Sequence, residues 1–314
     1  MIKYLKIILV TLLVFYQSPL YSKINQFNDF NLRNFSNYFS AVVAIDNQKN
    51  IDALKYFDSS LDLLNKHDPY LKKYVYSLIS EKKYRKAMHI LKSYKNTKNS
   101  DFFESHLLLI INNVKKEDFK NNARHLLNLS RYSNQGQFEA IIYDTLKNYS
   151  FLFENKRINK DKRLLSNITY ITSAFENCYL SNENTKSFFL NLISNNEVDY
   201  SRYKFFYINY LVENEKYQEA ENIIDQLDYL NSSLLLHQAK KWVKDKKLYK
   251  FSDLFSCKNE KDILSEFFFL IASLYSSQND IDKSNFYLSI SSYLNPKFKF
   301  NLSLLVENYF ENKN

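Results

Sequence analysis

The residues best suited to metal or acid–base chemistry are five histidines, and they are scattered along the chain: His67, His89, His106, His125 and His237. A helical zinc site of the common protease type needs two histidines four residues apart with a glutamate between them, and other zinc sites use closely spaced cysteine pairs. Neither pattern occurs here. We therefore expect each histidine to be a helix-surface or half-buried residue, and we predict no metal site.

Glycine bears on cofactor chemistry, because the loops that cradle phosphates need its conformational freedom. The phosphate-binding loop requires two glycines, the dinucleotide fingerprint three and the serine-hydrolase elbow two. The chain has one glycine, Gly136, and no run of acidic residues surrounds it as a calcium loop would require. The sequence thus excludes these motifs, and we predict no bound cofactor.

One dipeptide needs comparison with a known enzyme class. Exported lytic transglycosylases have helical superhelices and use a catalytic Glu followed by Ser, as in Glu104-Ser105. No glycine-rich segment follows to shape a sugar groove. Glu104 also precedes an apolar run, where an acid complements the dipole at the start of a helix. We expect a protein with no catalytic residues, and a helical cell-wall lytic enzyme is the alternative.

Two basic stretches could bind anions. One is Glu81–Lys86, and the other surrounds the only tryptophan, Trp242, with five lysines: Lys240, Lys241, Lys244, Lys246 and Lys247. These lysines either contact anionic lipid or cell-wall polymer, or form a solvated helix face above a buried Trp242. The formal charge of +9 adds little to this, because lysines on solvated helix faces account for it equally well, and we expect peripheral contact at most. We predict no nucleic-acid partner, because an exported protein rarely meets one.

The elements that position these side chains are predicted to be helices. One glycine and three prolines among 314 residues are too few for the many turns of an all-β or α/β protein of this size. The apolar content of 45% is sufficient for a core. We expect an all-α fold with polar loops.

Small residues recur at a fixed interval. Ala53 and Ala87 lie 34 residues apart, and each is followed four positions later by Phe57 or Leu91. The clearest copy is near the C-terminus, where the turn Gln278-Asn-Asp280 separates two helical patterns and Pro296 ends the second. The positions assigned to the five copies are Ala41, Ala44, Ala53, Phe57 and Ser60; Leu71, Tyr74, Leu78, Tyr84, Ala87 and Leu91; Leu107, Ile110, Val114, Ala123, Leu127 and Ser130; Tyr207, Leu211, Tyr217, Ala220, Ile224 and Leu227; and Phe268, Ile271, Ala272, Tyr275, Ser284, Leu288 and Ser291.

This order and spacing resemble the tetratricopeptide repeat (TPR), a 34-residue helix-turn-helix unit. The resemblance is clear over 35–131, 202–229 and 265–314, and the segments 138–196 and 233–262 read as degenerate helical pairs. It implies one TPR-like α-solenoid over 23–314, a right-handed superhelix with a concave groove. A non-repeating helical bundle is the alternative fold.

In proteins of this repeat type the first helix of each pair lines the groove, where a peptide or partner helix binds. The residues that the register places there are Tyr38, Val42, Lys72, Tyr76, Arg202 and Asn209. They combine aromatic faces, two cations and one amide, which suits an extended peptide with acidic and apolar side chains. Binding on the convex side is the alternative.

The N-terminus reads as an export signal over residues 1–22. Lys3 and Lys6 precede the apolar run Ile7–Tyr16, and cleavage is expected after Ser22. Such a run spans about 15 Å as a helix, which is short for a membrane. An uncleaved anchor in the inner membrane is the alternative. After export we expect Cys178 and Cys257 to be separate buried thiols, and a disulfide between them is the alternative.

The expected function is a non-enzymatic protein-interaction scaffold or adaptor in the bacterial periplasm. The alternative is a membrane-tethered envelope assembly factor.

The C-terminal pattern Leu302, Leu305, Val306 and Tyr309, with Phe310 beside it, predicts a final helix with an exposed apolar patch.

Overall fold

The computed structural model describes residues 31–94, 97–161, 167–194, 201–227 and 233–311, which are helical and contain no strand. The all-α prediction is confirmed. The helices are α2 (Leu32–Asp46), α3 (Asn50–Asp58), α4 (Asp68–Ser80), α5 (Tyr84–Ser93), α6 (Phe103–Lys115), α7 (Asn122–Ser130), α8 (Gln137–Asn155), α9 (Asn167–Tyr179), α10 (Thr185–Ile193), α11 (Ser201–Glu213), α12 (Tyr217–Asp225), α13 (Leu234–Lys244), α14 (Tyr249–Leu254), α15 (Glu260–Ser276), α16 (Ile281–Leu294) and α17 (Ser303–Glu311). Short 3-10 turns occur at η1 (Leu61–Leu63), η2 (Lys98–Ser100), η3 (Phe119–Asn121) and η4 (Lys299–Leu302).

The turn after the first helix of each pair has the same backbone form. Its central residue has φ between 52° and 60°, as at Gln48, Lys82 and Glu117. The next residue donates its N–H to the carbonyl five positions back, for example Lys83 to Leu78 at 2.7 Å. This Schellman motif satisfies the last carbonyls of the helix. Gln48 and Lys82 are 34 residues apart, as are Ser181 and Glu215, so the architecture is repeat-like at the backbone level.

Glycine occupies none of these turns. The left-handed positions carry Gln, Lys, Glu, Ser or Asn, and Gly136 itself is extended with φ of −169°. The loops between the helices are therefore polar, as predicted, and polar residues with side chains adopt their left-handed positions.

Most assigned repeat positions are buried. Ala53, Ala87 and Ala220 are at most 1% exposed, as close helix approach requires, and Pro296 follows the end of α16. The register fails in α7, where Ala123 and Leu127 are exposed while Asn122 and Leu129 are buried. The extra turn η3 precedes α7 and rotates its inward face by one residue. Tyr217, at the start of α12, is also exposed.

The segment 138–196 contains one long helix followed by a pair. Helix α8 has 19 residues, and α9 and α10 then form a hairpin. Cys178 at the end of α9 forms a disulfide with Cys257, which follows α14, with their Cα atoms 5.9 Å apart. The bridge ties two segments separated by 79 residues. Of the two alternatives for the cysteines, the structure contains the disulfide.

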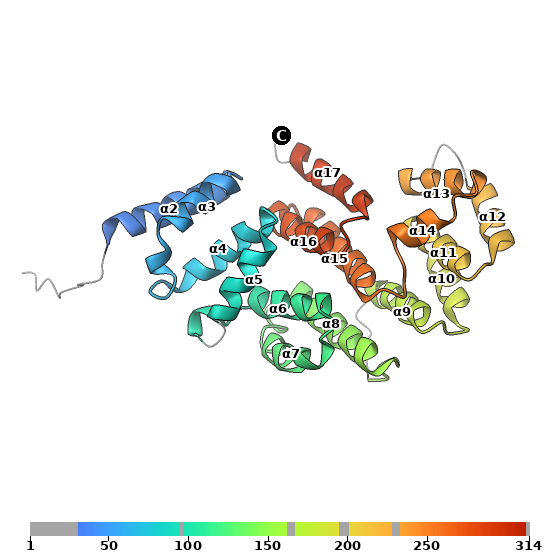
Figure 1. Ribbon diagram of the computed structural model, residues 1–314, viewed down its shortest axis with the longest axis horizontal. Coiled ribbons are helices and arrows are strands. Elements are labelled where there is room, and N and C mark those ends of the chain that lie inside the picture. Colours follow the sequence, from blue (N-terminus) through green and yellow to red (C-terminus); the bar gives the residue numbers. More distant parts are fainter. Residues whose placement is uncertain (1–30, 95–96, 162–166, 195–200, 228–232, 312–314) are drawn as a thin grey trace, which may run out of the picture.

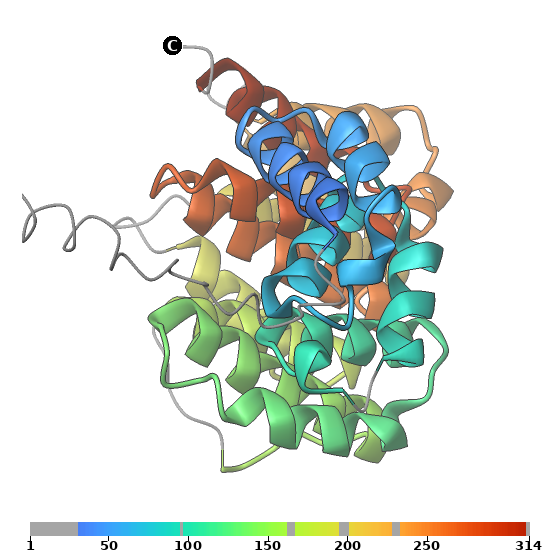
Figure 2. The ribbon, with the colours of Figure 1, turned by 90° about the vertical axis from the view of Figure 1, so that its left-hand side faces the viewer.

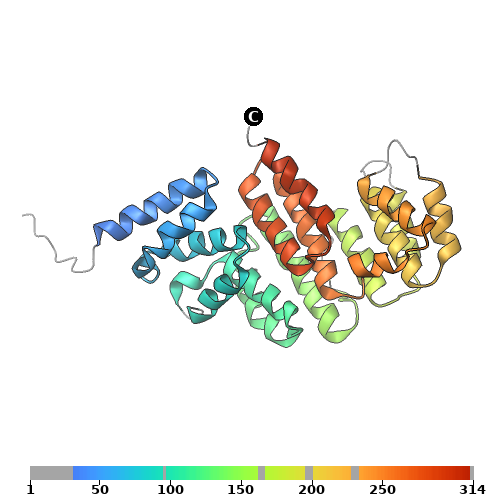
Figure 3. The same ribbon diagram turned by 45° about the horizontal axis from the view of Figure 1, so that its top comes forward.

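The α15–α16 hairpin packs back against earlier helices. It lies in the middle of the elongated molecule, between the N-terminal hairpins and α9 to α14 (Figures 1 and 3). Tyr76 on α4 stacks on Phe286 of α16 with ring centroids 4.4 Å apart, and the Tyr84 hydroxyl donates to the Ser289 carbonyl at 2.7 Å. Phe138 on α8 meets Tyr275 of α15 at 4.5 Å. The C-terminal hairpin is thus held by contacts with α4, α5 and α8.

The last helix, α17, lies at the top of the molecule on the side of α2 and α3, whereas α6, α7 and α8 form the bottom (Figure 2). Its residues Leu305, Val306, Tyr309 and Phe310 are exposed, the last by 63%. The predicted apolar patch on the C-terminal helix is confirmed.

The predicted signal peptide, residues 1–22, lies outside the described residues, and none of the described helices is long and apolar enough to cross a membrane.

Candidate functional site

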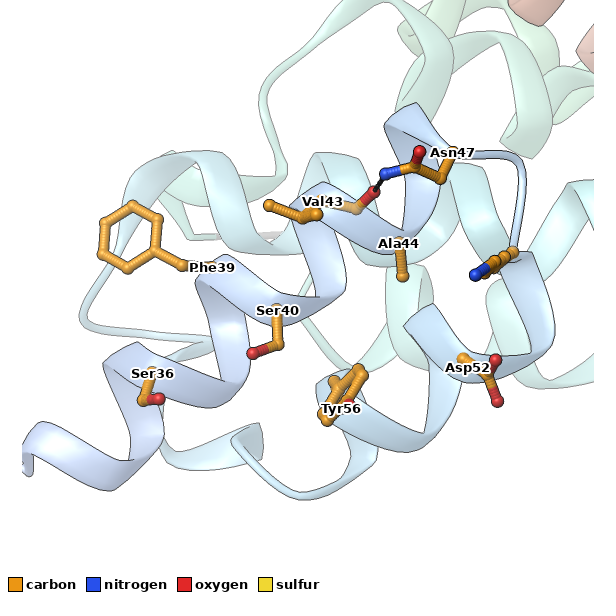
Figure 4. Close-up of a pocket in the computed structure, with 9 residues that line it drawn as sticks. Ser36, Phe39, Ser40, Val43, Ala44, Asn47, Asp52 and Tyr56 are labelled. Atoms are coloured by element: carbon orange, nitrogen blue, oxygen red, sulfur yellow. Dashed lines mark hydrogen bonds between the residues drawn. The ribbon is translucent and has the colours of Figure 1, made fainter.

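The first hairpin carries an open hollow of about 620 Å³ between α2 and α3. It is lined by Ser36, Phe39, Ser40, Val43, Ala44, Asn47, Lys49, Asp52 and Tyr56. Ser40 and Ala44 on α2 face Tyr56 and Asp52 on α3, while Phe39 and Val43 lie along the outer edge of α2 (Figure 4). The hollow therefore runs along the length of the hairpin.

The surface of this hollow is apolar at its edges and polar at its ends. Phe39 and Val43 are each 59% exposed, and Tyr56 is 41% exposed. Asp52 forms an ion pair with Lys55 at 2.9 Å, and this hydrogen bond lowers the pKa of Asp52. Asn47 donates to the Val43 carbonyl at 2.7 Å. An apolar surface with a polar rim is typical of protein–protein contacts.

Local sequence explains why α2 presents this face. Asn31 caps the helix, and its side chain accepts from the N–H groups of Arg33 and Asn34. Tyr38 and Ala41 face the core. Ser36, Phe39, Ser40 and Val43 follow the spacing of one helical face, which leaves them on the outside. This spacing is visible in the sequence, but the repeat register predicted Tyr38 and Val42 as the binding residues of this helix.

The two predicted groove residues on α2 lie inside or beside the core. Tyr38 is 4% exposed, meets the His67 ring at 4.5 Å and stacks on Tyr70 at 5.7 Å. Val42 is half-buried and packs against the same core. Neither lines an open groove.

The two predicted residues on α4 have separate environments. Lys72 is exposed and forms an ion pair with Glu104 at 3.1 Å. Tyr76 is covered by Phe286 of α16, and its hydroxyl is buried without a hydrogen-bond partner in the described residues. Burial raises the pKa of Tyr76. The surface expected to receive a peptide at Tyr76 is occupied by the chain's own hairpin.

The two predicted residues on α11 are also engaged by the chain itself. Arg202 forms a bidentate pair with Glu266 of α15, at 2.8 Å from Nε to Oε1 and 2.7 Å from Nη2 to Oε2, and its guanidinium lies 4.0 Å from the Phe269 ring centroid. Asn209 is 1% exposed and donates to the Phe255 carbonyl at 2.9 Å. The six predicted residues thus do not gather at one open surface.

The lysines predicted to contact membrane or cell wall lie on and just after α13. Lys241, Lys244, Lys246 and Lys247 are exposed and Lys240 is half-exposed, while Trp242 is buried beneath them. This agrees with a solvated helix face above a buried tryptophan. Contact with an anionic surface stays a prediction.

Glu104, the residue compared with the lytic enzymes, lies in the first turn of α6 with its side chain 13% exposed. It forms an ion pair with Lys72 at 3.1 Å. In the described part of the chain, no three His, Cys, Asp or Glu side chains gather as a metal site would require.

Comparison with protein-family models, with curated proteins and with solved structures finds no match for this chain. The function must therefore be inferred from the surface that the fold presents.

Proposed function

We propose that the protein is a non-enzymatic protein-interaction scaffold of the TPR-like type, which binds a helix of a partner protein in the hollow between α2 and α3. The observation that supports this most directly is the exposure of Phe39, Val43 and Tyr56 along one hollow. Contiguous exposed apolar surface with a polar rim favours an interaction site.

The shape of the hollow favours a helix as its occupant. In a helical array each hairpin buries its apolar faces against helices of its neighbours. Helix α3 packs on α4 on one side. On its other side the hairpin has no helix among the described residues, and the hollow lies where a preceding helix would pack. An amphipathic helix with apolar residues at i, i+3 or i+4, and i+7 fits such a surface.

This proposal moves the binding site away from the concave groove. The aromatic and cationic residues expected there contact α15 and α16. A peptide in that groove must displace this hairpin, whereas a helix at α2–α3 needs no rearrangement.

We also propose export to the periplasm. The basic and apolar N-terminal segment supports it, and so does the disulfide between Cys178 and Cys257, since disulfides persist in oxidising compartments. N-terminal sequencing of the protein from cells tests this. Lys23 as the first residue supports cleavage, while an intact Met1 indicates the tethered alternative.

The binding site is tested by photo-crosslinking in cells. A photoreactive phenylalanine analogue replaces Phe39 or Val43, and the same analogue at exposed Tyr170 on α9 serves as the control. We expect one discrete adduct from positions 39 and 43 that is absent from position 170. Adding Ser40→Arg, which fills the hollow, should abolish it while the helical circular dichroism spectrum is unchanged.

Mapping the crosslinked peptide separates the possible occupants. A helical segment of another protein, with apolar residues on one face, supports the proposal. An adduct to residues 1–30 of the same chain, an adduct to a second copy, or no adduct above the control contradicts it.

A further inference from the structure

A second, polar cleft of about 390 Å³ lies between α6 and α7. Its lining combines basic, amide and hydroxyl side chains: Lys92, Ser100, Ser105, His106, Leu109, Asn113, Asn121, Arg124, His125 and Asn128. No acidic side chain lines it. The cleft is separate from the hollow on the first hairpin and does not depend on the function proposed for that hollow.

In the described part of the chain, the lysine and the arginine of the cleft have no carboxylate partner. Among the residues that the structure describes, neither Lys92 nor Arg124 forms an ion pair. Partial burial, and then the neighbouring Lys116, lower the pKa of Lys92. Arg202, by contrast, is paired with the buried Glu266. The cleft therefore concentrates positive charge that the protein itself leaves uncompensated.

Asp101, which contacts the cleft residue His106, is already engaged. It accepts from His106 Nε2 at 2.8 Å and from Arg131 Nη2 at 2.9 and 3.1 Å, and the Tyr132 hydroxyl also donates to it. The hydrogen bond between Asp101 and His106 fixes the buried His106 ring, so that its Nδ1 faces Nδ1 of His125 at 3.5 Å. Asp101 thus holds the wall of the cleft and does not neutralise its cations.

Polar groups without partners also line the cleft. The Ser105 side chain is 1% exposed, yet within the described ranges its hydroxyl forms no hydrogen bond. The side-chain amides of Asn113 and Asn128 likewise form none with the described residues. The Ser105 hydroxyl is not among the fully buried side-chain atoms that lack a partner, so it is accessible from the cleft. These groups are available as donors to a ligand.

We propose that the cleft between α6 and α7 binds a small oxyanion, a phosphate or a dicarboxylate, through Arg124, Lys92 and the Ser105 hydroxyl. Guanidinium and ammonium groups supply charge-assisted hydrogen bonds, and the amides and hydroxyl complete the shell. Phosphate and carboxylate share this chemistry.

Calorimetric titration of the mature protein with inorganic phosphate and, separately, with succinate in chloride buffer tests the proposal. We expect saturable one-site binding of at least one anion. Arg124→Gln should weaken it about tenfold or more. Lys120→Gln removes an exposed lysine on η3 that does not line the cleft, and should bind as the wild type does.

Each possible result either supports the anion site or overturns it. Binding of phosphate alone identifies a phosphate ligand, and binding of succinate alone identifies a carboxylate. Absence of saturable binding of either anion overturns the site, as does equal weakening by Arg124→Gln and Lys120→Gln, which indicates general attraction to a basic surface. Ser105→Ala, a small change at a buried position, should also weaken binding and tests the site if Arg124→Gln disturbs folding.

Discussion

At the scale of single residues, the hairpin turns carry a conformational cost. Among the described residues, eight with side chains adopt positive φ, a region that favours glycine because a Cβ atom crowds the backbone there. Asn279 tolerates this region better than the others, since asparagine visits it readily. All of these turns except the one at Lys156 keep the Schellman hydrogen bond to the carbonyl five positions back despite this cost.

Because of this conformational cost, replacing such a turn residue with glycine should stabilise the protein. Glu215 is exposed with φ of 60°, so Glu215→Gly should raise the free energy of unfolding by about 0.5 to 1 kcal/mol. The matched control is Glu221→Gly in the exposed middle of α12, which should lower it by about the same amount. Denaturant unfolding measures both, and a destabilised Glu215→Gly protein contradicts the turn geometry.

A second residue-scale feature is the carboxyl of Asp262, which accepts from the Ser256 N–H at 2.9 Å. Burial raises its pKa from 3.8 to about 6, against the opposing effect of that hydrogen bond and of nearby lysines. The folded protein therefore holds this proton more tightly than the unfolded chain does. Its contribution to stability is fully present below about pH 4 and is lost as the pH rises through about 6.

Asp262→Asn tests this pH dependence, because the amide keeps an oxygen acceptor and cannot ionise. Relative to the variant, the wild type should lose about 2 to 3 kcal/mol of stability between pH 4 and pH 7. Chemical denaturation at a series of pH values measures the difference. A difference that does not change with pH means that the Asp262 pKa is not raised.

At the scale of elements, the sequence predicts the helices and their pairing better than it predicts which hairpins pack against one another. The small residues Ala53 and Ala87 mark close helix contacts because only they fit there. The inward face of α7 lies one residue away from the predicted register, because the short turn η3 precedes this helix. The hydrophobic spacing of the sequence does not reveal that turn. The contact between Tyr76 and Phe286, 210 residues apart in sequence, follows no local spacing. The groove prediction failed for that reason.

The α15 hairpin is held to α11 by a buried ion pair, which makes a testable prediction. Glu266 is 2% exposed, and burial raises its pKa while Arg202 opposes that effect. Arg202→Met leaves the carboxylate without its partner and should destabilise the protein by about 3 kcal/mol. The double variant Arg202→Met/Glu266→Leu should recover most of this loss in thermal or denaturant unfolding. No recovery would show that Arg202 acts mainly through its contacts with aromatic rings.

At the scale of the whole molecule, the chain curves so that its C-terminal hairpin packs on its N-terminal half, and one disulfide spans α9 to α14. Closing a loop of 79 residues restricts the unfolded chain. Cys178→Ser/Cys257→Ser should therefore lower the free energy of unfolding by about 2 to 4 kcal/mol. Reducing agent should destabilise the wild type similarly and leave the double variant unchanged. If reductant affects neither protein, the bridge does not form.

The hollow between α2 and α3 could have been found from sequence only in part. Phe39 and Val43 follow a helical spacing, but so do the buried Tyr38 and Ala41 beside them, and the pattern alone does not tell which face is covered. Coverage depends on where neighbouring helices pack. The candidate site therefore became visible only with the three-dimensional arrangement.

The most direct test of the proposed interaction surface is the affinity of the purified protein for the partner identified by crosslinking at positions 39 and 43. We predict that Phe39→Ala raises the Kd about tenfold or more, because a large aromatic ring buried in a contact contributes strongly to binding. Leu127→Ala, at an apolar residue on α7 that is 71% exposed, should leave the Kd within about twofold of the wild-type value. Equal Kd values for Phe39→Ala and the wild type, measured by calorimetry on proteins with unchanged helicity, would contradict a binding site at the first hairpin.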